Sequence, residues 1–210
     1  MTTTTHLSKP LSPKKQALYD AILLAALNTF AQFGFDATST RQIAAEAGME
    51  QGHLSYYFKS KEELWRAVLL SFQVEFRAMI EQSIAAAPQG TGVERARAIL
   101  PPFLRHFSDN AQLSRIMLQE FSIASARHDW VVDTFARPIW ERLQPLFEQL
   151  EAEGALPGIG ALPAYFAMVG AAVTTFGSSG EVHRLADADP LDTAFVDGLI
   201  TFLMRGVGAA

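Results

Sequence analysis

Residues 38–64 read TSTRQIAAEAGMEQGHLSYYFKSKEEL, and this stretch predicts the local fold around it. Ser39 or Thr40 can cap a short helix, because a hydroxyl oxygen at that place accepts a hydrogen bond from a free N–H of the first turn. Gly48 ends the helix, where a tight turn needs a positive φ. A second short helix then covers about residues 51–57. The inward-facing residues of the two helices are apolar: Ile43, Ala44, Ala47, Leu54 and Phe58. Two short helices joined by a glycine turn form a helix-turn-helix.

The outer face of the second helix is small and polar, as entry into the major groove of DNA, about 12 Å wide, requires. Five residues make up this face: Gln51, Gly52, His53, Ser55 and Tyr56. A glutamine amide can read adenine with two hydrogen bonds, and serine and histidine can reach base edges or phosphates. Groups that can bind phosphate flank the face: Thr40, Arg41, Tyr57 and Lys61. Lys61 also begins a long predicted helix, whose free N–H groups attract anions.

This ordered pattern resembles the DNA-binding domain of the TetR family of transcriptional regulators. The match covers about residues 14–66, and its most specific part is the spacing from Ile43 through Gly48 to Tyr57 and Lys61. The resemblance implies an all-helical protein, with three helices for DNA and then about six for a ligand and for dimerisation. It implies phosphate contacts at Thr40, Arg41, Tyr57 and Lys61, and base-edge contacts at Gln51, Gly52, His53 and Tyr56.

Two positions depart from the family's pattern. Many members carry Tyr where this chain has Ser55, and Ser is usual where it has Glu50, near the N-cap of the second helix. A carboxylate at position 50 suits the positive end of the helix dipole but is repelled by a nearby phosphate. The departures therefore affect the expected operator sequence more than the expected mode of binding.

Charge is distributed unevenly along the 210 residues, whose formal net charge is −5. Residues 1–66 hold seven Lys/Arg and six Asp/Glu, whereas residues 67–210 hold ten and sixteen. All five lysines lie in the first part, so the overall acidity does not exclude a nucleic-acid partner there. Cysteine is absent, which excludes disulfides and thiolate chemistry and fits a reducing, cytoplasmic location.

The composition predicts three parts: a flexible arm over residues 1–13, a DNA-binding domain over 14–66 and a ligand-binding and dimerisation domain over 67–210. The arm contains a threonine run and two prolines, Pro10 and Pro13, and a tail is the favoured interpretation over an arm in the minor groove. The uncharged stretch 154–180 raises the question of a membrane span. Its apolar helical part, about residues 164–176, is too short to cross a bilayer, so no membrane partner is expected.

Periodicity predicts helices throughout, with no convincing strand pattern. The first helix has Pro13 near its first turn and Gly34 just after its end. Ser60 to Glu63 matches a capping box that opens a helix over residues 61–86. Later helices are predicted near 93–107, 112–126, 130–153, 162–176 and 191–207, and Pro138 and Pro145 should kink or divide the third of these.

Aromatic residues recur in the second domain, where most must belong to an ordinary core. The resemblance implies that some line a ligand cavity, and the candidates are Phe72, Phe76, Phe103, Phe107, Met117, Phe121, Trp130 and Phe166. An effector bound there should be apolar or aromatic, because polar anchors are sparse. The candidate anchors are His106, Arg115, Glu120 and His128, although surface positions or internal ion pairs are the commoner roles of such residues.

No catalytic, cofactor or metal signature is found in the sequence. The motifs G-x-S-x-G, H-E-x-x-H and Walker A are missing, and the run from Gly158 to Gly160 lacks a third glycine and a preceding strand. His106, Asp109, Glu120 and His128 have spacings that match no known set of metal ligands. We therefore expect neither an enzyme nor a cofactor or metal.

The last two predicted helices indicate a second copy of the chain as a partner. The final helix is apolar on two faces, so it needs two surfaces to bury against. One stripe contains Leu191, Phe195, Gly198, Leu199 and Phe202, and the other contains Val196, Ile200, Met204 and Val207. The preceding helix is rich in small residues that allow close approach. A homodimer through these helices is favoured over the alternative that both fill one monomer.

The sequence as a whole predicts a dimeric, ligand-responsive DNA-binding regulator, most simply a repressor that binds a pseudo-palindromic operator. Two other classes stay open at this point. A helical enzyme would need a polar catalytic cluster, and a ligand-binding or scaffold protein would show no salt-dependent affinity for DNA.

Overall fold

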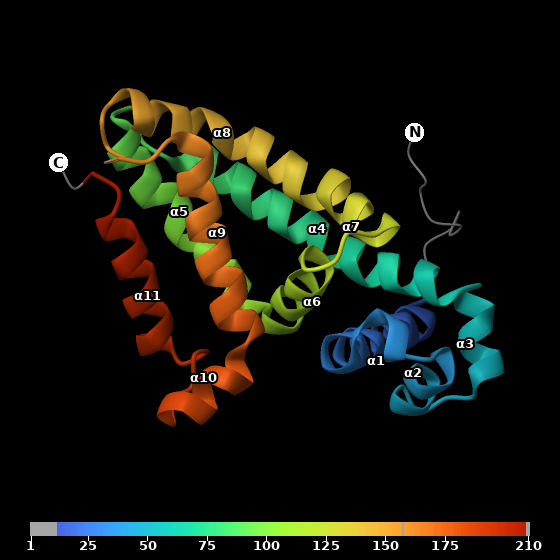
Figure 1. The fold of residues 1–210 in the computed structure, drawn as a ribbon. Helices are drawn as coiled ribbons and strands as arrows, with labels where there is room; N and C mark the ends of the chain where they lie inside the picture. Colours follow the sequence, from blue (N-terminus) through green and yellow to red (C-terminus); the bar gives the residue numbers. More distant parts are fainter. Residues whose placement is uncertain (1–11, 157, 209–210) are drawn as a thin grey trace. The chain divides into compact units, whose positions relative to one another are not determined.

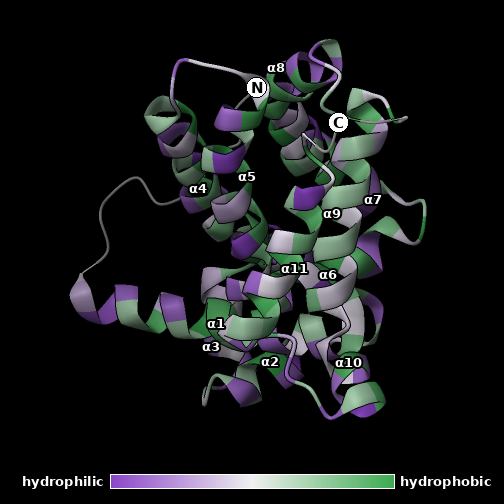
Figure 2. Cartoon of the chain, turned by 90° about the vertical axis from the view of Figure 1, so that its left-hand side faces the viewer, coloured by the Kyte–Doolittle hydropathy of each residue, from purple (hydrophilic) through white to green (hydrophobic). Residues whose placement is uncertain are grey.

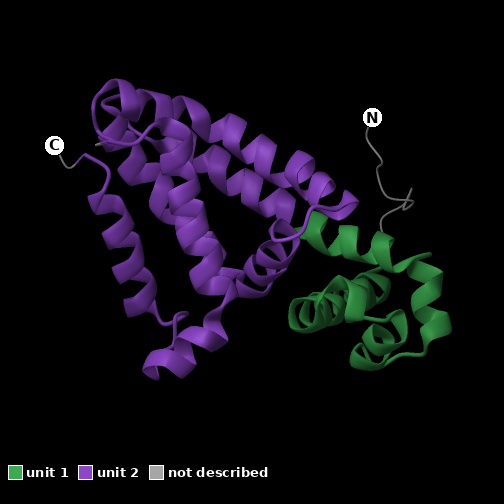
Figure 3. Cartoon of the chain, viewed as in Figure 1, with its two compact units in different colours: residues 1–71 green, residues 72–210 purple. Residues whose placement is uncertain are grey.

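A computed structural model describes residues 12–156 and 158–208, and within them the chain is helical without a strand (Figure 1). The prediction of an all-α fold is thereby confirmed. The chain divides into two compact units, residues 1–71 and residues 72–210 (Figure 3). This division falls five residues after the predicted boundary at 66/67. The predicted arm lies outside the described residues except for Ser12 and Pro13, and Pro13 already belongs to the first helix.

Unit 1 contains α1 (Pro13–Ala37), α2 (Thr40–Glu46), α3 (Gln51–Tyr57) and the beginning of α4 (Lys61–Ala86). Ile22, Ala26 and Phe30 of α1 are buried, so one face of this helix forms the unit's core. The regular part of α1 ends at Gly34, as predicted, because Gly34 takes φ 77° and ψ 170°. One further short turn follows before α2.

The beginning of α4 follows the predicted capping box in one half only. The Ser60 hydroxyl oxygen accepts a hydrogen bond from the Glu63 N–H at 3.0 Å, as such a box requires. The Glu63 carboxylate, however, accepts from the N–H of Lys59 at 2.8 Å, one residue before the expected donor. The N-terminus of α4 is still capped, because both hydrogen bonds satisfy backbone N–H groups that have no partner within the helix. It ends at Ala86, before Pro88.

Unit 2 contains the rest of α4 and a bundle of later helices. These are α5 (Gly92–Asp109), α6 (Ala111–Phe121), α7 (Ala126–Val131), η1 (Val132–Ala136), α8 (Arg137–Ala152), α9 (Ala161–Gly177), α10 (Ser179–Ala186) and α11 (Thr193–Arg205). Helix α9 packs against α5, α6 and α8, and it carries no charged residue (Figure 2). A core of aromatic and aliphatic side chains from these helices fills the unit.

The helix predicted over residues 130–153 is interrupted in the structure by a π-helical turn. This turn, η1, joins α7 to α8, and the Thr134 carbonyl in it accepts a hydrogen bond from the Gln73 amide of α4. Pro138 is the second residue of α8, directly after the π-helical turn, so it lies where one type of helix changes into the other. Pro145 remains inside α8.

Two predicted boundaries in unit 2 are wrong. The helix expected over residues 112–126 ends at Phe121, and a separate helix, α7, begins at Ala126. The short helix α10 was not predicted. No proline or glycine marks the point where α6 stops, which explains why the sequence pattern did not predict that break. Helix α10 is short, and it follows directly after Gly177 at the end of α9.

Candidate functional site

The helix-turn-helix of unit 1 is built on a small buried contact. The Ser39 hydroxyl oxygen caps α2 by accepting from the Gln42 N–H at 3.2 Å. Ile43 and Ala44 are 0% and 1% exposed, so this helix is anchored by its inner face. Gly48 has φ 67° in the turn, a conformation that side-chain-bearing residues rarely adopt. The N-cap at Ser39, the buried face of α2 and the turn at Gly48 thus agree with the prediction from the sequence.

Helix α3 turns its polar face outward. Leu54 is 1% exposed and Phe58 5%, so these two side chains fix the helix to the unit. Tyr57 is half-buried, and the ring of Tyr56 is 69% exposed. The exposed residues are those predicted to face the groove: Gln51, Gly52, His53, Ser55 and Tyr56. We call these five residues the α3 face.

Polar contacts arrange several side chains on and beside the α3 face. The Gln51 amide donates to the Thr40 hydroxyl oxygen at 3.3 Å, which ties α3 to the start of α2. The Ser55 hydroxyl donates to the Gln51 carbonyl at 3.0 Å. The rings of Tyr56 and Tyr57 meet edge-on with centroids 5.4 Å apart. Arg41 is exposed, and among the described residues it has no ion-pair partner.

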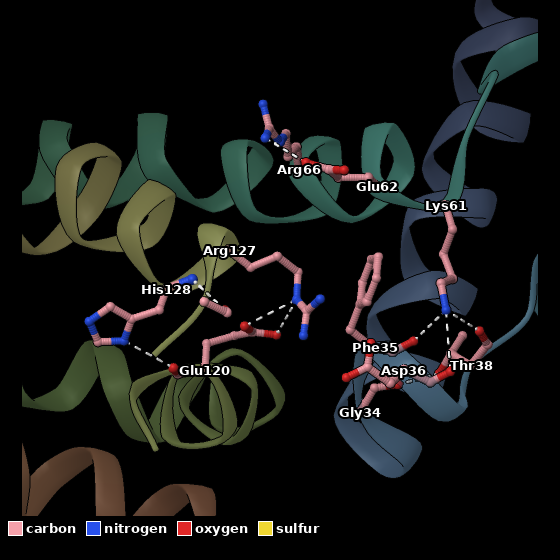
Figure 4. Close-up of polar contacts among 11 residues, drawn as sticks. Gly34, Phe35, Asp36, Thr38, Lys61, Glu62, Arg66, Glu120, Arg127 and His128 are labelled. Atoms are coloured by element: carbon pink, nitrogen blue, oxygen red, sulfur yellow. Dashed lines mark hydrogen bonds and ion pairs between the residues drawn. The ribbon is translucent and has the colours of Figure 1, made fainter. Parts of the chain in front are cut away.

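Lys61, predicted to bind phosphate, is engaged within unit 1 (Figure 4). Its ammonium donates to the carbonyl oxygens of Phe35 at 2.7 Å, Thr38 at 2.8 Å and Asp36 at 3.4 Å. It also lies 4.3 Å from the centroid of the Phe35 ring. The positive charge of Lys61 therefore stabilises the free carbonyl oxygens of the short turn that follows Gly34. A phosphate would compete with these oxygens for the hydrogen bonds of the ammonium.

Unit 2 holds a cavity of about 60 Å³ between α4, α5, α6, η1, α8 and α9. Phe76 is central to its wall, since its ring stacks on that of His106 with centroids 4.1 Å apart and on that of Phe103 at 5.7 Å. The lining residues are Phe76, Phe103, His106, Phe107, Asn110, Leu113, Ser114, Met117, Phe121, Phe135, Ala136, Ile139, Tyr165, Val169 and Val173. The wall is therefore overwhelmingly apolar, as small-molecule sites usually are.

Five of the eight residues predicted to bind ligand line this cavity: Phe76, Phe103, Phe107, Met117 and Phe121. Phe72, Trp130 and Phe166 are not among the lining residues, and Phe166 is 63% exposed. Residues on α9 at spacing i, i+4 and i+8 were missed, namely Tyr165, Val169 and Val173. This spacing marks one face of a helix and was available in the sequence.

Of the four candidate anchors, only His106 lines the cavity. Arg115 instead donates to the Gly177 carbonyl at 2.8 Å and to the Ser179 hydroxyl at 3.2 Å, at the end of α9. Glu120 is buried and accepts from the Arg127 guanidinium at 3.2 Å (Figure 4).

The fourth candidate, His128, lies 3.2 Å from the Glu120 carbonyl through its Nδ1 atom. Arg115, Glu120 and His128 thus hold helices together. No group of three or more residues that could hold a metal occurs in the described part of the chain.

Burial changes the acid–base character of two cavity residues. Desolvation raises the pKa of the Tyr165 phenol to about 12. It also lowers the pKa of the His106 imidazole, against the opposite effect of the nearby Asp109 and Glu75 carboxylates. Both side chains are therefore neutral at pH 7, the phenol protonated and the imidazole unprotonated.

Helices α9 and α11 each leave a large apolar side chain uncovered. Phe166 of α9 is 63% exposed and Phe202 of α11 is 69% exposed. Small residues on the same two helices, Ala167, Gly170 and Gly198, are exposed as well. The second stripe predicted on α11 is used internally, since Val196 and Ile200 are buried. We call the exposed residues Phe166, Ala167, Gly170, Gly198 and Phe202 the α9–α11 face.

Two parts of the chain have the length and hydropathy of a membrane span. One is α1, and the other is the bent pair formed by α9 and α10. The core helix of a globular domain meets the same two criteria. In unit 1, Ile22, Ala26 and Phe30 of α1 are buried against protein, and this agrees with a core helix.

Comparison with known proteins links these features to one family. The family model described as bacterial regulatory proteins, tetR family, matches residues 22–68. The HTH-type transcriptional regulator RutR of Escherichia coli K12 is 52% identical over 67 residues, which cover 32% of this chain and 30% of RutR. The chain thus matches less than a third of the length of this curated relative.

Solved structures extend the likeness to the whole fold. A transcriptional regulator of the TetR/AcrR family from Thermobifida fusca YX-ER1 is 26% identical, with a TM-score of 0.57 over 89% of this chain and 94% of that one. AibR, solved in complex with isovaleryl coenzyme A and operator DNA, is 16% identical, with a TM-score of 0.69 over 91% of this chain and 98% of its own. The second likeness shows the fold alone.

The fold and the two sites define an all-helical protein with an N-terminal helix-turn-helix unit and a C-terminal helical bundle that encloses an apolar cavity. Residues 22–68 match the model of the TetR family of bacterial regulatory proteins, and the curated relatives and solved structures support a TetR-family regulator.

Proposed function

We propose that this protein is a sequence-specific DNA-binding transcriptional regulator. The observation that carries the proposal is the α3 face, an exposed set of hydrogen-bonding side chains on a helix that Leu54 and Phe58 fix to a buried core. Gln51 and His53 are placed to read base edges, while Arg41, Thr40 and Tyr57 flank them as phosphate contacts. The likeness to RutR supports the same role.

The proposed assembly is a homodimer formed through the α9–α11 face. Phe166 and Phe202 expose apolar area that a monomer leaves in water, and the exposed glycines on the same two helices allow another helix to approach closely. A two-fold dimer presents two α3 helices, so the operator should be pseudo-palindromic, with half-sites separated by whole turns of about 34 Å.

The proposed regulation is release of a repressor from its operator when a small, largely apolar effector enters the cavity of unit 2. Helix α4 carries Phe76 in the cavity wall and also begins with Lys61 in the DNA-binding unit, so one element belongs to both. An effector acts only through its preference for the state that does not bind DNA, and a 100-fold preference corresponds to about 2.7 kcal/mol. The proposed location is the cytoplasm.

The test is a titration of the full chain with duplex DNA from the region upstream of its own gene, at about 50 mM and 200 mM salt. We expect specific binding that weakens steeply with salt. Gln51→Ala should reduce the preference for the upstream DNA over random duplex about tenfold or more, because one base contact contributes about 1–3 kcal/mol. Gln112→Ala, an exposed glutamine on α6, is the matched control and should change neither.

Two results would refute the proposal. A titration that stays flat at low salt would favour a ligand-binding or scaffold protein, and turnover of a compound in the cavity would favour an enzyme. If Gln51→Ala left the preference unchanged while the parent bound specifically, the α3 face would lose its role as reader and the protein would keep only its general affinity for DNA.

A further inference from the structure

The polar groups that line the cavity of unit 2 have hydrogen-bonding capacity to spare. Tyr165 is 6% exposed, and among the described residues its hydroxyl has no hydrogen-bond partner. The Asn110 side-chain nitrogen donates to the His106 carbonyl at 2.9 Å and also lies 3.3 Å from the His106 Nδ1 atom. The Asn110 side-chain oxygen is left as an acceptor. The Tyr165 oxygen is not among the fully buried side-chain atoms that lack a partner in the described residues, so this hydroxyl keeps some access from the cavity and is free to bond a ligand.

Ser114, the remaining polar residue of the wall, is already used. Its hydroxyl donates to the Phe107 carbonyl at 2.8 Å. Three groups of the wall therefore have spare capacity. They are the Tyr165 hydroxyl on α9, the second ring nitrogen of His106 on α5, and the side-chain oxygen of Asn110, which lies between α5 and α6. A donor and acceptors are present together in a cavity that is otherwise lined by carbon.

None of the lining residues is an Asp, Glu, Lys or Arg. Arg115, which the sequence suggested as a charged anchor for the ligand, is instead bonded to the end of α9. A charged ligand would lose its hydration on entering this cavity and would find no opposite charge in the wall, so its binding is disfavoured. The lining thus selects against ionised groups.

We propose that the effector is a small uncharged molecule, with an apolar body about the size of one ring or a short chain and a single hydroxyl or carbonyl group held by Tyr165 and the His106–Asn110 pair. This inference rests on the proposed ligand-responsive function and names the class of ligand for that site.

The size of the cavity sets the upper limit of this class. About 60 Å³ equals only a few water-sized volumes, since one bound water needs about 10–15 Å³. A single ring fits once Met117, a flexible side chain, and Phe121, which is 38% exposed, adjust their positions. A coenzyme A thioester, as carried by AibR, would bring phosphates to a wall without cations.

The experiment is calorimetric titration of the full chain, without DNA, at pH 7 with three single-ring probes. Phenol is uncharged and carries a hydroxyl, toluene lacks the hydroxyl, and benzoate is an anion. We expect saturable binding of phenol, and binding of benzoate at least tenfold weaker. Tyr165→Phe should weaken phenol about five- to tenfold, as the loss of one hydrogen bond predicts, and leave toluene unchanged. Tyr19→Phe, a half-buried tyrosine in unit 1, is the matched control.

Three results would overturn the inference. They are no saturable binding of phenol, binding of benzoate or isovaleryl coenzyme A as tight as that of phenol, or an equal effect of Tyr165→Phe on phenol and toluene. Because these titrations contain no DNA, they are separate from the test of the proposed function. If phenol fails to bind while the protein still binds DNA specifically, only the effector class is wrong. If phenol binds as expected and DNA does not, only the regulatory role falls.

Discussion

The ammonium group of Lys61 has two candidate roles, one in binding DNA phosphate and one in bonding backbone carbonyls within unit 1. As a phosphate contact it would supply charge to DNA, yet in the structure its protons are spent on three carbonyl oxygens and its charge lies against the Phe35 ring. The two roles have different signatures. A phosphate contact changes the salt dependence of DNA affinity, whereas a bond to backbone oxygens changes the stability of the domain.

We expect Lys61→Ala to lower the free energy of unfolding by about 1–2 kcal/mol, because hydrogen bonds from a charged donor contribute about that much. If Lys61 also binds phosphate, the slope of log affinity against log salt should fall by about one. Thermal unfolding and salt titrations measure the two effects. Lys59→Ala, an exposed lysine two residues earlier, is the control for stability and should leave it nearly unchanged. An unaltered slope would remove Lys61 from the phosphate contacts.

Among the elements, the turn between α2 and α3 depends most on one residue type. Gly48 has φ +67°, and a Cβ built there meets nothing within 4 Å, so the cost of a side chain is conformational and not steric crowding by neighbours. Gly48→Ala should therefore destabilise the protein by about 1–2 kcal/mol. Gly180→Ala, at an exposed helical glycine of α10 with equally open space, should be neutral or slightly stabilising. Equal melting temperatures for Gly48→Ala and the parent would show that the turn tolerates another geometry.

The elements of unit 1 could be predicted from sequence because local chemistry determines them. Ser39, Gly48 and Ser60 mark helix ends by capping or by positive φ, and the predicted span of α3 agrees with the structure. The ends of α6 and α10 could not be predicted, since α6 stops at Phe121 without a glycine or proline and α10 is only eight residues long. Six of the fifteen residues in the cavity wall were predicted. The rest were missed because the wall draws on six elements, whereas a periodic pattern describes one helix at a time.

At the scale of the whole molecule, the exposed apolar area on α9 and α11 is the surface on which the proposed homodimer depends. Phe202→Glu should convert the expected dimer into a monomer, because a carboxylate would have to be buried without a partner. Sedimentation velocity measures the change. Leu185→Glu, at an exposed leucine of α10 outside the α9–α11 face, is the control and should leave the mass unchanged. A dimer that survives Phe202→Glu would place the interface on another surface.

The π turn from Val132 to Ala136 has a consequence for how the bundle can rearrange. It contributes Phe135 and Ala136 to the cavity wall, and such a turn holds about one residue more than an ordinary one. Passing that surplus residue along the helix would swing every side chain it crosses by about 100°. A shift of the π turn by one residue would therefore replace one side chain of the cavity wall by the next, while the two ends of the α7–η1–α8 helix keep their positions.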